Sequence, residues 1–587
     1  MTKCQNCAQE FDVSPDDENL CKKLEVPAPT WCPKCRLQRK MSRRNERSLY
    51  KATCAKCSKE TISMYDKNSP YAVYCRECWW SDAWDPTSYG KDYDFSQSFF
   101  EQFKDLSREV PRAALLQKGD IESPYTNYTD HNKNSYLIFN CGFLEDSMYN
   151  RWGVSSKNIV DTFSIFDSEL LYESQEVKNS HKSIYLILSE SCMNSSFLYN
   201  CHGCQDCFLS SNLKNKKYCF KNVQYSKEDY EKKVSEIDLG SYEDFQKTLR
   251  EFREEIIPNA LRKYVIGNKL TDSTGDYLFQ CKNVRDSFHV SESEDSRHCV
   301  DCANLKNCMD AYESAFNCEL QYDCHGCNRT SRSKFASSSY DDFDIEYSEF
   351  CHNSHHLFGC VGLRSKEYCI LNQQYTKEEY EELLPRIKKH MSDMPYTDQK
   401  GRIYKYGEFF PPELSPFAYN ETLAQEYFPL AKKEVEAQGY KWKESDTKTH
   451  SATISPDKLP DNIKDVEDGI TKEVIGCKHA GECNHQCTTA FKIIPAELQF
   501  YRHMGVPLPR LCPNCRHYER LSQRNPLKLW KRQCMCAGTG SEDRSYKNAA
   551  SHEHHGKNPC PNEFETSYAP ERPETVYCEE CYKQEMV

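Results

Sequence analysis

The sequence lacks long hydrophobic runs: no apolar stretch approaches the roughly 20 residues that span a bilayer. No apolar signal-peptide segment follows the start Met1-Thr2-Lys3-Cys4. We therefore expect an unexported, cytoplasmic protein that has no membrane partner. The chain also lacks an excess of positive charge: acidic residues outnumber basic ones, and the formal net charge is −12. This excludes a general polyanion binder, and any nucleic-acid surface must be local.

Cysteine, by contrast, is abundant, with 35 residues in a chain of 587. In an intracellular chain such a number indicates metal thiolates and buried thiols before disulfides. The alternative interpretation is a secreted disulfide protein. A chain of this length also exceeds the size of one hydrophobic core, so several domains are expected.

Two cysteine arrays occupy the first 80 residues. Each consists of two Cys-x2-Cys pairs, which can complete the closed tetrahedral shell of four sulfurs that Zn²⁺ prefers in structural sites. A redox role for Cys-x2-Cys would need a thioredoxin-like βαβ context, which is absent here. The predicted ligands are Cys4, Cys7, Cys32 and Cys35 in the first array, and Cys54, Cys57, Cys75 and Cys78 in the second.

The first array recurs near the other end of the chain. A shift of 480 residues superimposes Cys7 on Cys487, Cys32 on Cys512 and Arg44-Asn45 on Arg524-Asn525. The predicted third site is Cys483, Cys487, Cys512 and Cys515, with Cys477 as the alternative to Cys483. The predicted fourth site is Cys534, Cys536, Cys578 and Cys581, for which Cys560, His552, His554 and His555 compete as ligands. About four zinc ions per chain are therefore expected.

The centre of the chain carries a second repeat. Short β-rich segments recur about every 10 to 12 residues, separated by polar turns, which is typical of a parallel β-helix. The block is duplicated, because Leu213–Glu231 and Leu363–Glu381 are identical at 11 of 19 positions. Its 16 cysteines are interpreted as small buried thiols stacked in the interior, with a further metal centre as the alternative.

The predicted fold is thus multidomain and mainly β. Small zinc-ribbon or treble-clef modules at both ends flank a duplicated parallel β-helix-like solenoid with capping α-helices. The predicted domains are zinc module 1 (1–50), zinc module 2 (51–80), a helical connector (81–125), solenoid copy 1 (126–226), a helical cap (227–270), solenoid copy 2 (271–376), a helical segment (377–440), a polar linker (441–459), zinc module 3 (460–533) and zinc module 4 (534–587).

Basic residues gather directly after two of the zinc knuckles. The net charge is +8 over residues 32–60 and +6 over residues 510–534. A rigid module that presents such residues can contact phosphates and stack on unpaired bases, which favours RNA. The opposing interpretation is a solvated face, or pairing with the protein's own acidic solenoid. The candidate nucleic-acid-binding residues are Arg36, Arg39, Lys40, Arg43, Arg44, Arg47, Arg516, Arg520, Arg524, Lys528, Lys531 and Arg532.

The knuckle Cys32-Pro33-Lys34-Cys35-Arg36, followed by Arg44-Asn45, resembles the zinc-ribbon or treble-clef modules of large bacterial proteins whose function is not established. The resemblance implies zinc binding and no particular activity. Three hypotheses follow: a non-enzymatic zinc scaffold that binds RNA through both ends, a scaffold for protein assembly or self-association that uses the solenoid face, and a β-helix enzyme acting on carbohydrate. The first is favoured, so no catalytic residue is predicted.

Overall fold

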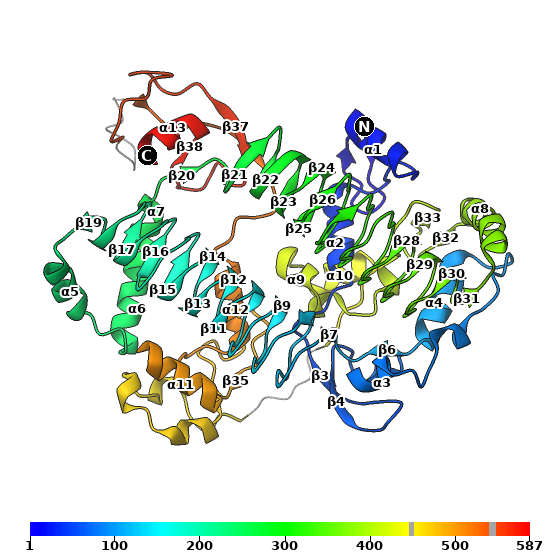
Figure 1. Ribbon diagram of the computed structural model, residues 1–587, viewed down its shortest axis with the longest axis horizontal. Helices are drawn as coiled ribbons and strands as arrows, with labels where there is room; N and C mark the ends of the chain where they lie inside the picture. Colours follow the sequence, from blue (N-terminus) through cyan, green and yellow to red (C-terminus); the bar gives the residue numbers. More distant parts are fainter. Residues whose placement is uncertain (445–450, 539–547, 587) are drawn as a thin grey trace.

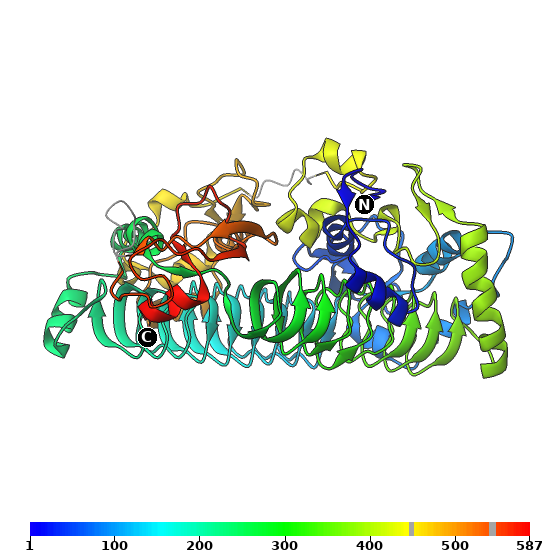
Figure 2. The same ribbon diagram turned by 90° about the horizontal axis from the view of Figure 1, so that it is seen from above.

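Two stacks of parallel strands run through the molecule (Figure 1), and most of the two cysteine-rich chain ends lies on one side of the stacks in the view of Figure 2. The computed structural model describes residues 1–444, 451–538 and 548–586. The chain is multidomain, with cysteine clusters at both ends. Part of the predicted linker 441–459 lies outside the described residues.

The first stack, residues 117–224, pairs each segment with the one 12 residues later. Arg151 lies beside Phe163, and Phe163 lies beside Gln175. It starts within the predicted connector 81–125. Its strands are β7 (Gln117–Lys118), β8 (Thr129–Asp130), β9 (Phe139–Gly142), β10 (Arg151–Val154), β11 (Lys157–Val160), β12 (Phe163–Phe166), β13 (Glu169–Tyr172), β14 (Gln175–Lys178), β15 (His181–Ile187), β16 (Ser196–Tyr199), β17 (Gln205–Ser211), β18 (Lys217–Phe220) and the antiparallel β19 (Val223–Gln224).

The second stack, residues 267–374, repeats this arrangement. Its register is again 12 residues at Phe343 and His355, but 13 at Leu305 and Cys318, where one residue is inserted. Its strands are β21 (Gly267–Thr271), β22 (Gly275–Arg285), β23 (Ser287–Ser291), β24 (Glu294–Arg297), β25 (Val300–Ala303), β26 (Leu305–Lys306), β27 (Cys318–Glu319), β28 (Phe343–Glu346), β29 (His355–Phe358), β30 (Glu367–Ile370) and the antiparallel β31 (Gln373–Gln374).

A three-residue period underlies both stacks. Along the first stack, residues such as His131, Asn134 and Leu137 adopt left-handed backbone angles at every third position. Buried small or aliphatic side chains recur with the same spacing. Ser147 shows why serine suits these positions: its hydroxyl donates to the Glu145 carbonyl (2.7 Å) and accepts from the Ile159 amide (3.3 Å) in the next layer. Buried hydroxyls thereby satisfy backbone groups that the short strands leave free.

Helices end each stack, as the sequence predicts. The side chains of Ser226 and Thr376 cap α5 (Lys227–Ser235) and α8 (Lys377–Asp393). The two helices lie at opposite ends of the molecule (Figure 1). The predicted helical connector 81–125 contains α4 (Phe99–Glu109), whose Phe99, Phe100 and Phe103 are buried. The remaining helices between the modules are α6 (Tyr242–Glu251), the π-helical η2 (Phe252–Ile256), α7 (Ile257–Asn259), α9 (Leu423–Tyr427) and α10 (Lys432–Ala437).

The terminal modules share one plan, in which a knuckle joins two short strands and a second knuckle opens a helix. In module 3 a further helix, α11, begins at Pro495 and is capped by Gly505, which has a left-handed backbone. The module elements are β1 (Thr2–Lys3), β2 (Glu10–Phe11), α1 (Pro15–Lys23), α2 (Pro33–Met41), β3 (Tyr50–Thr53), β4 (Glu60–Ser63), β5 (Val73–Tyr74), α3 (Arg76–Trp80), β34 (Ile475–Gly476), β35 (Ala490–Phe491), α11 (Pro495–Met504), α12 (Pro513–Leu521), β36 (Trp530–Gln533), β37 (Glu563–Thr566), β38 (Val576–Tyr577) and α13 (Glu579–Met586).

Several short elements complete the chain. They are the strands β6 (Arg112–Ala113), β20 (Arg262–Lys263), β32 (Tyr396–Thr397) and β33 (Ile403–Tyr404), and the 3₁₀ turns η1 (Pro86–Tyr89), η3 (Pro412–Leu414), η4 (Tyr419–Glu421), η5 (Pro456–Lys458), η6 (Ile463–Asp465) and η7 (Asp468–Lys472). Among the described residues, none of these helices has the length and apolar character needed to cross a bilayer.

Candidate metal centres and their docking surfaces

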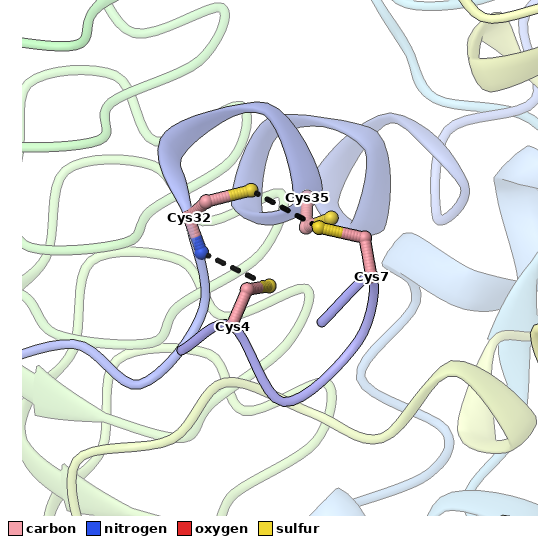
Figure 3. Close-up of side chains that lie close together, drawn as sticks. All are labelled: Cys4, Cys7, Cys32 and Cys35. Carbon is pink, nitrogen blue, oxygen red and sulfur yellow. Dashed lines mark hydrogen bonds between the residues drawn. The ribbon is translucent and has the colours of Figure 1, made fainter. Parts of the chain in front are cut away.

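The four predicted cysteines of module 1 converge on one point (Figure 3). Cys4 and Cys7 come from the turn between β1 and β2, whereas Cys32 precedes α2 and Cys35 lies in its first turn. The Sγ atoms of Cys7 and Cys32 are 3.8 Å apart, and the Cys32 amide donates to Cys4 Sγ at 3.3 Å. Strand pairing and a helix start therefore bring together two distant sequence pairs.

Module 2 repeats this geometry with Cys54, Cys57, Cys75 and Cys78. Cys57 Sγ lies 3.8 Å from Cys75 Sγ, and the Cys75 amide donates to Cys54 Sγ at 3.2 Å. Burial acts to raise the pKa of the Cys54 thiol, but hydrogen bonds from backbone amides outweigh it and lower this pKa to about 6. The thiolate, which is the metal-binding form, is therefore favoured at neutral pH.

In module 3 the structure gathers Cys477, the alternative ligand, with Cys487, Cys512 and Cys515. The Cys512 amide donates a hydrogen bond to Cys477 Sγ at 3.3 Å. The first cysteine of modules 1 and 2 accepts the equivalent hydrogen bond. Cys477 directly follows β34, just as the first cysteine of module 1 follows β1. The predicted ligand Cys483 lies instead in a loop inserted between the two strands, with its Sγ 3.7 Å from that of Cys515.

In module 4 the structure gathers Cys534, Cys560, Cys578 and Cys581. Cys560 thus takes the position predicted for Cys536, because it lies three residues before β37, the same spacing that Cys57 has before β4. Its Sγ lies 3.9 Å from Cys578 Sγ, and the Cys578 amide donates to Cys534 Sγ at 3.2 Å. A long insertion separates the two members of this first knuckle.

The donor sets are compatible with zinc. An S4 tetrahedron with Zn–S bonds of about 2.3 Å has edges of about 3.8 Å. In each of the four groups one sulfur–sulfur distance, between 3.8 and 4.0 Å, is close to this edge length. Four thiolates leave no open coordination position, so such a centre stabilises its module and does not activate water. Five or more Cys and His groups among the described residues could hold a metal ion.

The helix that follows the knuckle in module 1 docks on the second stack. Arg36 of α2 donates to Asp310 (2.8 Å), and Lys40, one turn further on, contacts Asp323 (2.6 Å) and Asp310 (3.8 Å). All four side chains are at most 2% exposed. The attraction of Asp310 and neighbouring groups outweighs burial and raises the pKa of Arg36 further, so its charge is fixed.

Module 3 makes the same contact with the first stack. Arg516 of α12 pairs with Asp161, and Arg520 pairs with both Asp161 (3.1 Å) and Glu173 (2.9 Å). Arg516 and Arg520 correspond to the two basic residues of α2 at the offset of 480, and the two acids lie 149 and 150 residues before their counterparts in the second stack. One module–stack interface is therefore built twice, and each end of the chain uses a different stack.

The other arginines of the two basic segments are engaged as well. Arg44 and Arg524 each reach the junction between the stacks, where Arg151 of the first stack also pairs with Glu313 of the second (3.2 Å). The remaining partners are Asp323 and Glu408 for Arg39, Glu349 for Arg43, Glu46 and Glu313 for Arg44, Asn514 for Arg47, and Glu176 and His289 for Arg524.

This packing argues against the prediction that these arginines form a free nucleic-acid surface, except for Arg47, which is half-buried and whose polar partner is the Asn514 amide. A guanidinium that is buried against a carboxylate of its own chain cannot contact a phosphate, and the opposing interpretation, pairing with the acidic stacks, describes what is found. Among the last three candidates, Lys528 and Lys531 are exposed, and Arg532 donates to the Ala569 carbonyl (3.2 Å).

The cysteines within the stacks are buried. Cys192 is representative: its thiol donates to the carbonyls of Glu190 (3.5 Å) and Cys201 (3.4 Å). Cys324 behaves in the same way toward Tyr322 (3.4 Å) in the second stack. These thiols occupy the inward-facing positions of the three-residue period, as expected of small side chains that fill a narrow interior.

Sequence reasoning missed the acidic partners and two histidines, His479 and His485, that lie beside module 3. A signal for the acids was available, because Asp161 and Asp310 stand at nearly the offset that aligns the two stacks. The histidines carried no knuckle spacing, and only the fold brings them to Cys515.

Comparisons with known proteins do not assign the chain to a family. No family model matches it, and no curated protein does. Among solved structures, it is similar to a chain described as a putative acetyltransferase from Desulfovibrio desulfuricans G20, with 8% identity over 47% of this chain and 82% of the other. The TM-score is 0.08, at which the match carries no argument about fold or activity.

Proposed function

We propose that the chain is a non-enzymatic zinc-binding scaffold, in which four zinc modules of ribbon or treble-clef type lock two β-helix solenoids into one rigid body. The observation that carries this proposal is the duplicated interface. At each end of the chain, a helix that opens at a zinc knuckle places two basic side chains on two carboxylates of a stack.

The energetics explain why metal is needed for this arrangement. Removing a charge from water costs several kcal/mol per ion, and a pair recovers this cost only when its geometry is held fixed. The nine-residue helices α2 and α12 are too short to hold such a geometry alone. A structural zinc site contributes on the order of 10 to 16 kcal/mol to folding of its module, enough to hold the helix and its basic residues in place.

The same interface supports a second task for the modules, which is to connect the two stacks. Glu46 of module 1 accepts from Arg151 of the first stack (2.8 Å), while Arg44 beside it faces Glu313 of the second stack (4.0 Å). Both stacks therefore depend on one short segment that follows a zinc knuckle. A partner, whether RNA or protein, would bind this body through surfaces other than the buried arginines.

Paired variants in the zinc-loaded chain test the proposal. Arg516→Met with Arg520→Met removes the interface charges of α12, whereas Lys528→Ala with Lys531→Ala removes the same number of exposed charges from the same module. We expect the arginine pair to lower the urea midpoint measured by tryptophan fluorescence, and the lysine pair to leave it unchanged. An unchanged midpoint for the arginine pair, together with loss of RNA binding at low salt, would overturn the proposal.

A further inference from the structure

The first knuckles of modules 3 and 4 carry insertions that modules 1 and 2 lack. Nine residues separate Cys477 from Cys487, whereas two separate Cys4 from Cys7. The insertion in module 3 carries His479, Cys483 and His485, all of which are metal-ligating residue types. Modules 1 and 2 therefore show what the S4 group alone requires, and the additional ligands call for a separate explanation.

The inserted ligands of module 3 form a group of their own. The ligand atoms of His479, Cys483, His485 and Cys515 all lie within 4.8 Å of one another. Cys515 thus belongs to two groups, because its Sγ also faces Cys477 Sγ at 3.8 Å in the S4 set. Within the described residues, the Nδ1 atoms of both histidines are buried and have no hydrogen-bond partner. Buried imidazole nitrogens of this kind are satisfied when a metal or a second-shell group binds them.

The insertion in module 4 builds a comparable arrangement. Cys536 Sγ lies 3.2 Å from His552 Nδ1, which is itself 3.2 Å from His555 Nε2. His555 Nε2 then lies 3.3 Å from Sγ of Cys581, a member of the S4 set of this module. Two cysteines and two histidines again converge on a group that shares one sulfur with the neighbouring site.

The far sides of these two rings have the partners typical of metal-bound histidines. His552 Nε2 contacts the Glu585 carboxylate at 2.8 Å, and His555 Nδ1 contacts the Asn558 carbonyl at 2.7 Å. A metal-ligating histidine almost always donates its other ring N–H to a carboxylate or a backbone carbonyl, which fixes the ring and raises its basicity. In both rings the free nitrogen is thus directed at the cysteine sulfurs.

We propose that modules 3 and 4 each bind a second divalent ion through a bridging thiolate, Cys515 in module 3 and Cys581 in module 4. The second ion takes a Cys2His2 set, a donor combination that suits tetrahedral Zn²⁺. The proposal rests on the zinc binding proposed above and raises the expected content from about four ions to about six.

Charge favours the pair of ions over a single ion. Five thiolates around two divalent ions leave a net charge of −1 in each module, whereas four thiolates around a single ion leave −2. A smaller net charge is easier to bury. In module 3 a cavity of about 300 Å³ is lined in part by Lys478, His479 and Arg516, so it borders one member of the second group, His479.

The test is a metal count on the full chain. The protein is loaded with Zn²⁺, freed of excess ion by gel filtration, and measured by plasma mass spectrometry. We expect six ions per chain in the parent, and five in both the His479→Ala/His485→Ala and the His552→Ala/His555→Ala variants. His503→Ala, an exposed histidine on α11, serves as the control and should keep six.

The possible counts separate the two proposals. Four ions in the parent overturn the second-ion sites but leave the zinc scaffold standing, whereas no retained zinc overturns both. An unchanged count of six in the His479→Ala/His485→Ala variant shows that the extra ions bind elsewhere, and this also overturns the proposal. The parent count is read directly, so a variant that fails to fold does not remove the test.

Discussion

Asp161→Asn is the sharpest perturbation of the module–stack interface. Asp161 is fully buried and accepts from both Arg516 and Arg520, whose side chains are 3% and 2% exposed. Its backbone lies in the left-handed region, which asparagine tolerates as well as aspartate does. The substitution therefore removes one negative charge while it keeps the shape and the backbone of the stack.

The expected loss follows from the two arginines that remain. Breaking a buried ion pair by removing one partner costs about 3 to 5 kcal/mol, because the other charge stays buried without compensation. Asparagine still accepts one hydrogen bond, so the lower end of about 3 kcal/mol is expected. Since 1.36 kcal/mol corresponds to a factor of ten, local opening of α12 should become about a hundredfold more frequent.

Hydrogen–deuterium exchange of the α12 amides measures this opening directly. Asp167→Asn is the matched control, because Asp167 is the same residue type in the same stack, also has a left-handed backbone, and is exposed. The exchange rate of α12 should rise about a hundredfold in the Asp161 variant and remain unchanged in the control. Equal rates in the two variants would show that these ion pairs do not hold the module, and would refute the reasoning.

Two further predictions concern buried groups elsewhere. Burial acts to raise the pKa of Glu46, but Arg151 and Arg44 outweigh it and lower this pKa from 4.5 to about 2. The Glu46 carboxylate therefore contributes about 3 kcal/mol to the free energy of unfolding above pH 4.5, and this contribution is lost as the pH falls toward 2. The difference in unfolding free energy between the parent and Glu46→Gln should shrink over that range. A difference that does not change with pH would contradict this. Ser147→Ala leaves the Ile159 amide without its acceptor, so the free energy of unfolding in urea should fall by about 1 to 3 kcal/mol. A fall below about 0.5 kcal/mol, which is typical of a surface substitution, would show that buried serine hydroxyls do not stabilise the stack.

The four-cysteine groups were largely predictable, because Cys-x2-Cys spacing is a local property of one turn. The four-cysteine groups differ from the prediction at two positions, Cys477 instead of Cys483 and Cys560 instead of Cys536, and both differences have one cause. In modules 3 and 4 an insertion separates the two cysteines of the first knuckle. The prediction from spacing therefore took a cysteine inside the insertion, whereas the paired strands place Cys477 or Cys560 in the four-cysteine group. Only the fold distinguishes these alternatives.

The repeat was visible in the sequence, but its period was not identified. The sequence indicated parallel segments about every 10 to 12 residues, and the structure pairs Arg151 with Phe163 at 12. The underlying three-residue step escaped notice because an ordinary strand alternates its side chains with a period of two. Residues in the left-handed region at every third position, such as His131 and Asn134, replace that alternation.

The fate of the basic residues could not be decided from local sequence. Arg36 and Asp310 are 274 residues apart, and no spacing rule connects them. The charge excess after each knuckle was real, but charge alone does not distinguish a surface for phosphate from an interface with carboxylates of the same chain. The basic residues of the two modules repeat after 480 residues, and their acidic partners in the two stacks repeat after about 150. These two repeats together are the sequence signal that links each basic pair to its acidic pair.

Hydrogen–deuterium exchange before and after zinc chelation tests the central claim most directly. With zinc bound, the amides of α2 and α12 and those of the stack strands should all be protected. After chelation, the scaffold proposal predicts that α2 and α12 lose protection while strands β10 and β12 keep theirs, because only the modules depend on metal. Helices that exchange equally slowly with and without zinc would contradict the account.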